Sequence, residues 1–231
     1  MSGFQRGRAR EDRILAVSRV HKRDSIGWYL MGCPLMIDYK AVFLYDRKSK
    51  ERVLRMKKFK GYIQIYTGNG KGKTTAALGL ALRAAGRGYK TFIGQFIKGQ
   101  KYGELTAIKR LEPLVDIKQF GRSAFIHVNK DADPQDIAKA NKGLTTCLKA
   151  MLSGLYDIII LDEINVALYF NLIEEKKVHE FLDKKPENIE VILTGRYAPD
   201  SLIKRADLVT EMKEIKHYYT KKITARDGIE R

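Results

Sequence analysis

The stretch YTGNGKGKTTAALG combines glycines, lysines and threonines in a pattern that can bind phosphate. Gly68, Gly70 and Gly72 let the backbone bend sharply and bring successive N–H groups around phosphate oxygens. Lys73 supplies a positive charge for the same oxygens, and the Thr74 hydroxyl can join the coordination sphere of Mg²⁺. These residue types and their spacing predict a phosphate-binding loop that holds a nucleotide and its metal ion.

The opening of this loop differs by one residue from the common spacing G-x-x-x-x-G-K-[ST]. Counting back five positions from Gly72 leads to Thr67, whereas the first glycine of the loop is Gly68. A β-rich run precedes the loop and an alanine-rich helical pattern follows it, so the positive end of that helix would face the same phosphates. The residues expected to contact the nucleotide are Gly68, Asn69, Gly70, Lys71, Gly72, Lys73, Thr74, Thr75 and Arg196.

A second candidate element is YDIIILDE, an apolar run that ends in Asp162 and Glu163. Carboxylates at the end of a buried strand suit a Mg²⁺ ion that also binds nucleotide phosphates. We therefore expect Thr74, Asp162 and Glu163 on the metal side of the site. Two roles stay open for Glu163, because its carboxylate can bind the metal or act as a base that activates water.

Weaker candidates follow two other apolar runs of the sequence. Gln95 and Lys98 belong to QFIKG, and Arg196 belongs to ILTGR. Ligands of open α/β sheets usually bind at the carboxyl ends of the strands, which is where these side chains would lie. Solvation at the surface is the alternative for Lys98, and a structural ion pair is the alternative for Arg196.

From Gly61 onward, β-rich runs alternate with longer helical patterns. This alternation favours βαβ units and a parallel sheet. The expected strands are 62–67, 91–96, 115–120, 157–162, 189–194 and 207–212, and the expected helices are 73–87, 134–153, 174–183 and 199–204. The fold class is therefore α/β, as a single P-loop (RecA-like) domain over residues 57–231 with a mainly parallel sheet of about six strands flanked by helices.

Residues 1–56 differ from the rest in charge and pattern. The net charge of the chain is +17, and residues 1–60 alone hold 16 Lys and Arg against 6 Asp and Glu. We expect a basic extension upstream of a natural start at Met56, with a native accessory segment as the alternative. Because no DNA-reading or RNA-reading motif accompanies the charge, we expect no specific nucleic-acid partner.

The composition describes a globular protein, with 44% hydrophobic and 31% charged residues. Cys33 and Cys147 are too few for a disulfide scaffold, which favours a reducing compartment. The sequence contains no apolar run of the ~18 residues that a membrane helix needs. We expect a cytoplasmic protein with no membrane partner.

Five separated motifs carry a resemblance to one family. GNGKGKTTAALGLALRAAGRG, QFIKG with GE shortly after, ILDEIN, ILTGR and ADLVTEMKEIKHYY…GIE resemble the ATP:corrinoid adenosyltransferases of the cob(I)yrinic acid a,c-diamide type. The match runs from about residue 60 to the end of the chain, in the order of the family. The loop that begins at Gly68 is the form that this family uses.

The resemblance implies transfer of the 5′-deoxyadenosyl group of ATP to Co(I) of a reduced corrinoid, with release of triphosphate. Lys73 would then be the catalytic residue, and Mg²⁺, a homodimer and a flavoprotein reductant are implied with it. On the corrinoid side, Phe125 matches the family pattern, whereas His127 replaces its usual Trp. Lys222 stands where the family often has Gly. The chain shows no convincing Ser/His/Asp or Cys/His arrangement, and this reaction needs none.

Two other functions remain as alternatives to adenosyl transfer. One is a P-loop ATPase or kinase in which Glu163 activates water or another acceptor. The other is a nucleotide-gated nucleic-acid-binding protein, for which the positive charge is the only support.

Overall fold

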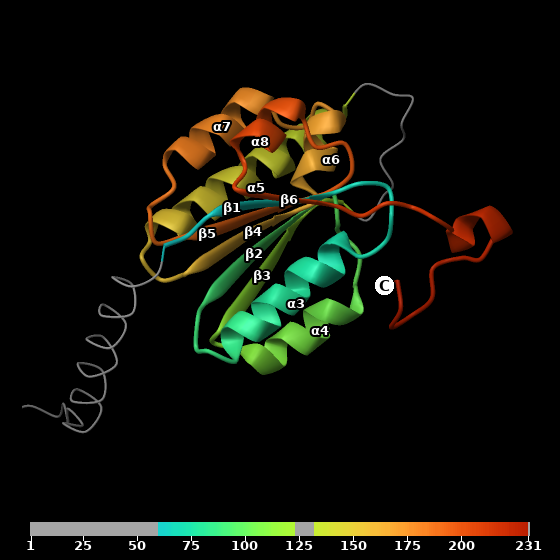
Figure 1. Cartoon of the computed structure of the whole chain (residues 1–231), viewed down its shortest axis with the longest axis horizontal. Helices are drawn as coiled ribbons and strands as arrows, with labels where there is room; N and C mark the ends of the chain where they lie inside the picture. The colour runs from blue at the N-terminus through green and yellow to red at the C-terminus, as the bar shows by residue number, and fades with distance from the viewer. Residues whose placement is uncertain (1–59, 123–131, 231) are drawn as a thin grey trace, which may run out of the picture. The chain divides into compact units, whose positions relative to one another are not determined.

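A six-stranded sheet forms the centre of the described part of the chain (Figure 1). The computed structural model describes residues 60–122 and 132–230. The strands are β1 (Ile63–Thr67), β2 (Thr91–Phe96), β3 (Val115–Phe120), β4 (Ile158–Asp162), β5 (Glu190–Thr194) and β6 (Leu208–Glu211). Their order is β3-β2-β4-β5-β1-β6, and every neighbouring pair runs parallel. The expected α/β class with a parallel sheet is thus confirmed.

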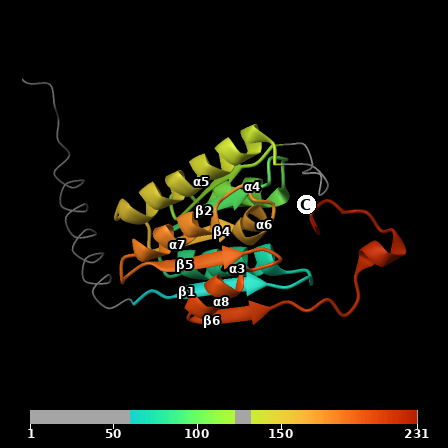
Figure 2. The ribbon, with the colours of Figure 1, turned by 90° about the horizontal axis from the view of Figure 1, so that it is seen from above.

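Helices cover both faces of this sheet (Figures 1 and 2). One face carries α3 (Lys73–Ala85) and α4 (Gly103–Ile108), the second continued by a short 3₁₀ turn, η1 (Lys109–Leu111). The other face carries α5 (Pro134–Leu152), α6 (Ile164–Tyr169), α7 (Glu175–Asp183) and α8 (Asp200–Arg205). After β6 the chain contains one more 3₁₀ turn, η2 (Tyr218–Lys221).

The strand sequences match this two-sided cover. In β2, β4 and β5 every residue is buried, which explains why the IIIL run of β4 is apolar without alternation. One core lies under α3 and α4, where small alanines such as Ala77 and Ala81 pack on Ile93 and Ile160. The other core lies under α5 to α8 and contains larger side chains, among them Phe181.

The order of the strands brings the candidate residues to one edge. All six strands point the same way, so the segments that follow β1, β2, β4 and β5 leave the sheet at its carboxyl edge. β5 lies between β1, which leads into the phosphate loop, and β4, which ends in Asp162. This edge is where open parallel sheets bind ligands.

The expected strands agree with the observed ones to within one residue at each end, and the four expected helices to within two. The short helices α4 and α6 were not expected. Residues 1–56, Phe125 and His127 lie outside the described residues. Within the described ranges, no helix combines the length and apolarity that a membrane crossing requires.

Candidate nucleotide-binding site

The glycines of the phosphate loop are required by the close approach of the chain after β6. The backbone N–H of Gly70 donates to the carbonyl of Met212 at 2.6 Å. A Cβ atom at Gly68 or Gly70 would lie 2.5 or 2.6 Å from that same oxygen, and Gly68 also has a φ of 92°. Thr67 is still part of β1, so the first glycine comes one residue later than in the common loop. The first glycine of the loop thus stands directly after the last residue of β1.

Lys73 is the first residue of α3 and lies inside the loop. Its Nζ donates to the carbonyls of Gly68 and Gly70, both at 2.7 Å. Burial lowers the pKa of Lys73, and nearby Glu163 opposes that effect. The first turn of α3 contains no acidic residue, so the positive end of the helix is left for an anion.

Asp162 is the hub of the hydrogen bonds beside the loop. Its side chain is only 1% exposed, and its Oδ1 accepts from the hydroxyls of Thr74 and Thr194, both at 2.8 Å. Its Oδ2 accepts from Gln95 Nε2 at 3.2 Å and from Lys98 Nζ at 3.0 Å. Burial of a carboxylate is costly unless its oxygens accept hydrogen bonds, as they do here. The bond to Thr74 joins the end of β4 to the first turn of α3.

Lys98 places a cation between two of the three expected metal ligands, Thr74 and Asp162. Its Nζ lies 3.2 Å from Thr74 Oγ1 as well as 3.0 Å from Asp162 Oδ2. Burial alone would lower the pKa of Lys98, but the charges of Asp162, Glu163 and Glu104 outweigh it and the pKa is raised. The hydroxyl and carboxylate oxygens here are hard ligands of the kind that Mg²⁺ binds. The ammonium thus stands in for a metal cation, and the residues present fit Mg²⁺.

Glu163 turns the chain from β4 into α6. It has a left-handed backbone with φ 64°, and its N–H donates to Thr194 Oγ1 at 2.9 Å. Burial, and then the charge of Asp162, raise the pKa of the Glu163 carboxyl. This geometry directs Glu163 into the cavity beside Asp162 and leaves both of its roles open.

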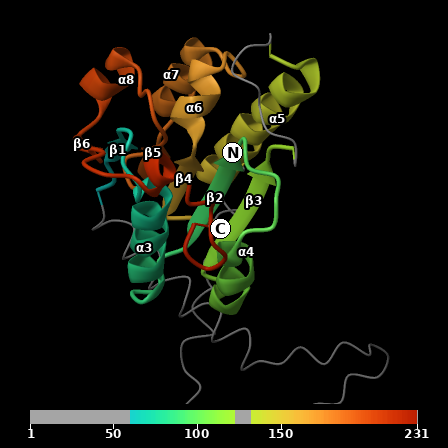
Figure 3. The same cartoon turned by 90° about the vertical axis from the view of Figure 1, so that its right-hand side faces the viewer.

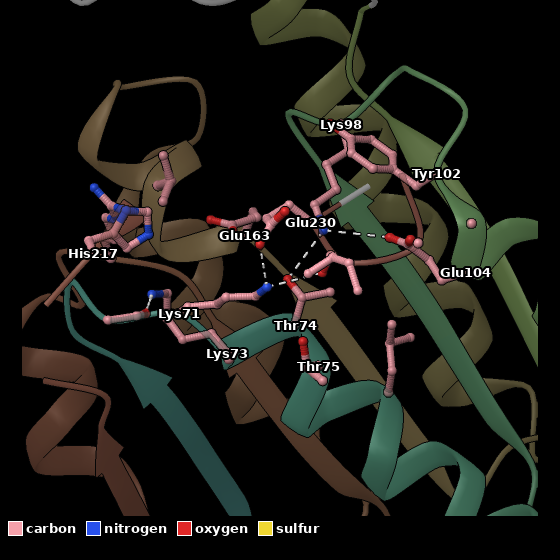
Figure 4. A pocket seen from close by; sticks show the side chains of 18 residues that line it. Lys71, Lys73, Thr74, Thr75, Lys98, Tyr102, Glu104, Glu163, His217 and Glu230 are labelled. Atoms are coloured by element: carbon pink, nitrogen blue, oxygen red, sulfur yellow. Dashed lines mark hydrogen bonds and ion pairs between the residues drawn. The ribbon is translucent and has the colours of Figure 1, made fainter. Parts of the chain in front are cut away.

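Lys73, Thr74, Lys98 and Glu163 border a cavity of about 750 Å³ (Figure 4). The loop and α3 face Lys98, Tyr102 and Glu104 across it, as the close-up shows. The lining residues are Gly70, Lys71, Gly72, Lys73, Thr74, Thr75, Leu78, Lys98, Tyr102, Gly103, Glu104, Glu163, Val166, Arg196, His217, Gly228, Ile229 and Glu230. Cavities of this size suit a nucleotide.

Most of the expected residues line this cavity, but Gly68, Asn69, Gln95 and Asp162 do not. Asp162 and Gln95 are buried next to it, and Asp162 is bonded to the lining residues Thr74 and Lys98. Gly68 and Asn69 are absent from the lining: Asn69 is exposed, and the Gly68 carbonyl is bonded to Lys73. Arg196 lines the cavity after the end of β5. Sequence reasoning missed the participation of Tyr102, His217 and the C-terminal Gly228–Glu230 segment. The motif ADLVTEMKEIKHYY contained His217 and the motif GIE is Gly228–Glu230, but residue type alone assigned them no role.

A parallel α/β sheet, a glycine-rich loop opening α3 and a buried carboxylate bonded to the loop threonine define a P-loop nucleotide-binding protein. The model of the family described as ATP:corrinoid adenosyltransferase BtuR/CobO/CobP matches residues 59–231. The chain belongs to this family.

Individual relatives agree with the family match. The chain is similar to the corrinoid adenosyltransferase of Sinorhizobium sp, with 36% identity over 80% of this chain and 87% of the relative. It is 33% identical to the corrinoid adenosyltransferase of Pseudomonas aeruginosa, over 78% of this chain and 88% of the relative. An uncharacterized protein of Nostoc sp. is 36% identical over 71% of this chain, but the chain spans only 47% of that longer protein.

Proposed function

We propose that this protein transfers the 5′-deoxyadenosyl group of ATP to Co(I) of a reduced corrinoid and releases triphosphate, in cobalamin biosynthesis or salvage. The observation that carries this proposal is the coincidence of the family match over residues 59–231 with the assembled phosphate loop and buried Asp162. The alternatives of an ATPase, a kinase or a nucleic-acid-binding protein are not favoured by any of the relatives.

The reaction needs a strong nucleophile and a stabilised leaving group. Co(I) of the corrinoid substrate donates an electron pair to C5′ of ATP, the C5′–O bond breaks, and triphosphate leaves with the bonding electrons. No proton has to be removed from the nucleophile. The protein therefore contributes position, exclusion of water and positive charge near the phosphates.

The charge for the leaving group comes from the loop side of the cavity. Lys73 at the N-terminus of α3 and Arg196 after β5 both line the cavity, which supports a role in binding the phosphates. Preorganised charges of this kind can stabilise a leaving anion without any bond to phosphorus. Lys73 is thus the proposed catalytic residue.

Mg²⁺ would be held by Thr74 and Asp162, with Glu163 beside them. When bound, Mg²⁺ supplies positive charge to the triphosphate oxygens. Lys98 lies between Thr74 Oγ1 and Asp162 Oδ2, so its ammonium has to move when the metal binds there. Glu163 is then proposed as a further metal ligand, since the reaction has no water to activate.

The remaining parts of the proposal rest on family resemblance. Phe125 and His127 are proposed for the corrinoid side, a homodimer for the assembly and a flavoprotein for the supply of electrons to cobalt. Residues 1–56 are proposed to be dispensable for the reaction, and the family match begins only at residue 59. A cytoplasmic location is proposed on the same grounds.

The deciding experiment is anaerobic incubation of the protein with MgATP and a chemically reduced Co(I) corrinoid. The absorbance change of Co–C bond formation and an equal amount of free triphosphate are expected. ADP and phosphate without a Co–C bond would identify an ATPase or kinase instead. Salt-sensitive DNA binding without either product would favour the nucleic-acid-binding alternative.

A further inference from the structure

The C-terminal segment of the described chain returns to the phosphate loop. After β6 the chain passes beyond the sheet and comes back toward the start of α3 (Figure 1). Figure 3 looks onto the carboxyl edge of the sheet and places the end of the chain in front of that edge. Gly228, Ile229 and Glu230 line the same cavity as Lys73 and Thr74. Residues more than 150 positions from the loop thus form part of the wall of the nucleotide site.

The returning segment ends in a small turn, residues 226–230, that is built around one carboxylate. Glu230 Oε2 accepts from the backbone N–H of Arg226 at 3.0 Å and from its Nε at 3.1 Å. The other oxygen, Oε1, accepts from a terminal guanidinium nitrogen of Arg226 at 3.0 Å. The guanidinium also lies over the ring of Tyr218, 4.8 Å from its centroid. Arg226, with Lys71 second, holds the pKa of Glu230 well below its usual range, so the carboxylate is charged at neutral pH.

Lys71 connects this turn to the phosphate loop. Its Nζ donates to Glu230 Oε1 at 2.9 Å and to the carbonyl of Ile229 at 3.1 Å. The two lysines of the loop therefore differ. The Lys73 ammonium bonds to carbonyls within the loop, whereas the Lys71 ammonium reaches away from the loop to the C-terminal turn.

The charges of the cluster are compatible with a nearby triphosphate. Glu230 is negative, but Lys71 and Arg226 are both bonded to it, so the three side chains together carry one net positive charge. A lone carboxylate at the rim of a phosphate site would repel the ligand. Here the carboxylate instead holds two cations in place beside it.

We propose that Lys71 and Glu230 act as a pair that docks the C-terminal turn as a wall of the nucleotide pocket. Glu230 is then a positioning residue for ATP, and the main task of Lys71 is to anchor this wall rather than to neutralise the triphosphate. The inference rests on the proposed function only in taking ATP as the ligand. The proposal gives Lys71 and Lys73 different roles, because their ammonium groups bond to different parts of the protein.

The size of the expected effect follows from the exposure of the pair. The Lys71 and Glu230 side chains are 42% and 20% exposed, so the ion pair is only partly shielded from water. Such a pair contributes up to about a fivefold change in an equilibrium constant. A single substitution should therefore weaken ATP binding by about three- to fivefold, a modest change that is measurable by calorimetry.

The test is a double-mutant cycle on the full-length protein. The dissociation constant of MgATP is measured without corrinoid for the wild type, Lys71→Ala, Glu230→Ala and the double variant. Each single variant should bind about three- to fivefold more weakly, and the double variant no more weakly than either single one, because both remove the same contact. The proposal would be overturned if the effects of the two single substitutions on the dissociation constant multiplied in the double variant. A Glu230→Ala variant with wild-type ATP affinity would overturn it as well.

Two further measurements separate positioning from a general loss of structure. In steady-state adenosylation, the KM for ATP should rise about three- to fivefold in Glu230→Ala while the KM for the corrinoid stays unchanged. An equal rise in both KM values would mean a nonspecific defect and contradict the proposal. Glu187→Ala is the matched control, because it removes the same side chain from an exposed position that does not line the cavity, and its ATP affinity should equal that of the wild type. A loss of affinity as large as in Glu230→Ala would overturn the specific role of Glu230.

The same data distinguish this inference from the proposed function. Coupled ATP binding without Co–C bond formation would leave the docking pair standing and refute adenosyl transfer. Co–C bond formation with no coupling between Lys71 and Glu230 would support adenosyl transfer and refute the docking pair.

Discussion

The ammonium of Lys98 lies 3.0 Å from Oδ2 of Asp162, at the point where the strand β4 ends. Asp162 is almost completely buried, and an unpaired buried carboxylate is costly. Lys98 also lies 3.2 Å from Thr74 Oγ1, so it bridges two of the three groups proposed to bind Mg²⁺. The protein therefore carries an internal cation that would compete with the proposed Mg²⁺ for the same oxygens.

This competition predicts the behaviour of Lys98→Met. The variant has no ammonium between Thr74 and Asp162, so the midpoint of Mg²⁺ activation should fall about tenfold, which corresponds to ~1.4 kcal/mol. The maximal rate of adenosylation should fall as well, because a cation near the triphosphate is lost. The measurement is a Mg²⁺ titration of the rate at saturating ATP.

Lys101→Met serves as the control for this substitution. Lys101 is an exposed lysine three positions further along the same loop, so its removal changes the net charge equally. Its Mg²⁺ midpoint should match the wild type. An unchanged midpoint in Lys98→Met would show that the metal binds elsewhere.

The loop lysine Lys73 should matter far more for turnover than Lys71. Lys73→Ala removes a buried cation at the start of α3, and loss of a preorganised charge of this kind costs about 10²-fold or more in kcat. The rate of triphosphate release is the measurement. Near-normal release by this variant would remove Lys73 from the proposed catalytic role.

Thr74→Ala tests the metal side of the same loop. The substitution deletes the hydroxyl that donates to Asp162 at 2.8 Å and that is proposed to bind Mg²⁺. The Mg²⁺ concentration for half-maximal activity should rise, by about tenfold if one metal ligand is lost. An unchanged metal response would place the ligand on another residue.

The acidity of Glu163 predicts a pH-dependent stability. Burial raises its pKa above the ordinary 4.5, so the folded protein binds this proton more tightly than the unfolded chain does. The stability that Glu163 contributes is thus complete below pH 4.5 and is lost as the pH rises through the folded-state pKa. Without metal or nucleotide, Glu163→Gln should melt about 2–4 °C above the wild type at pH 8.

The melting temperatures of the two proteins should converge as the pH is lowered toward 5. The exposed Glu187 supplies the control, because Glu187→Gln should leave the melting temperature unchanged at every pH. A Glu163→Gln variant that melts like the wild type at pH 8 would show that this carboxylate is not strained by its surroundings.

Local sequence signals were sufficient for most of the fold and the centre of the site. The IIIL run followed by Asp162 indicated a buried strand with a carboxylate at its end, and β4 has that form. The spacing of glycines and lysines located the phosphate loop, because the loop is formed by residues that are adjacent in the sequence. Short helices were harder to predict from the sequence. The helix α6 begins directly after Glu163 without a loop, and its six residues are too few to show a helical periodicity.

Contacts between distant parts of the chain could not be derived in the same way. The sequence left two interpretations of Lys98 open, a site residue or a solvated surface residue. The pairing of β2 with β4 is what brings Lys98 close to Asp162, and this pairing joins distant parts of the chain. Lys71 and Glu230 are separated by 159 positions, and no pattern in the sequence joins them. Lys222 is a related case: its φ of 58° is the left-handed conformation that glycine adopts easily, which explains why the family often has Gly there.

A protein that begins at Met56 tests the proposed domain boundary. It should fold and form the Co–C bond at close to the full-length rate, because the family match covers residues 59–231. It should also lose most nonspecific nucleic-acid affinity, since residues 1–60 hold 16 Lys and Arg against 6 Asp and Glu. An inactive or insoluble short form would make the upstream residues part of the enzyme.

The corrinoid side is tested by substitutions at Phe125 and His127. Co(I) needs a bare axial face, and an aromatic ring at Phe125 would keep water from it. Phe125→Ala should leave ATP affinity within about twofold but slow adenosylation sharply when cobalt is supplied as Co(II) with a weak reductant. With chemically reduced Co(I) the defect should be smaller, because the reduction step no longer limits the rate.

His127→Trp is the matching gain-of-function variant. His127 is a polar, titratable ring where the family places an indole, so it should exclude water less well than Trp does. The substitution should therefore leave the Co(I) reaction unchanged and match or exceed the wild-type rate with Co(II). Thermal melting and ATP affinity of both variants complete the test. If Phe125→Ala loses stability and ATP binding together and slows both cobalt reactions equally, Phe125 is an ordinary packing residue and the corrinoid assignment is wrong.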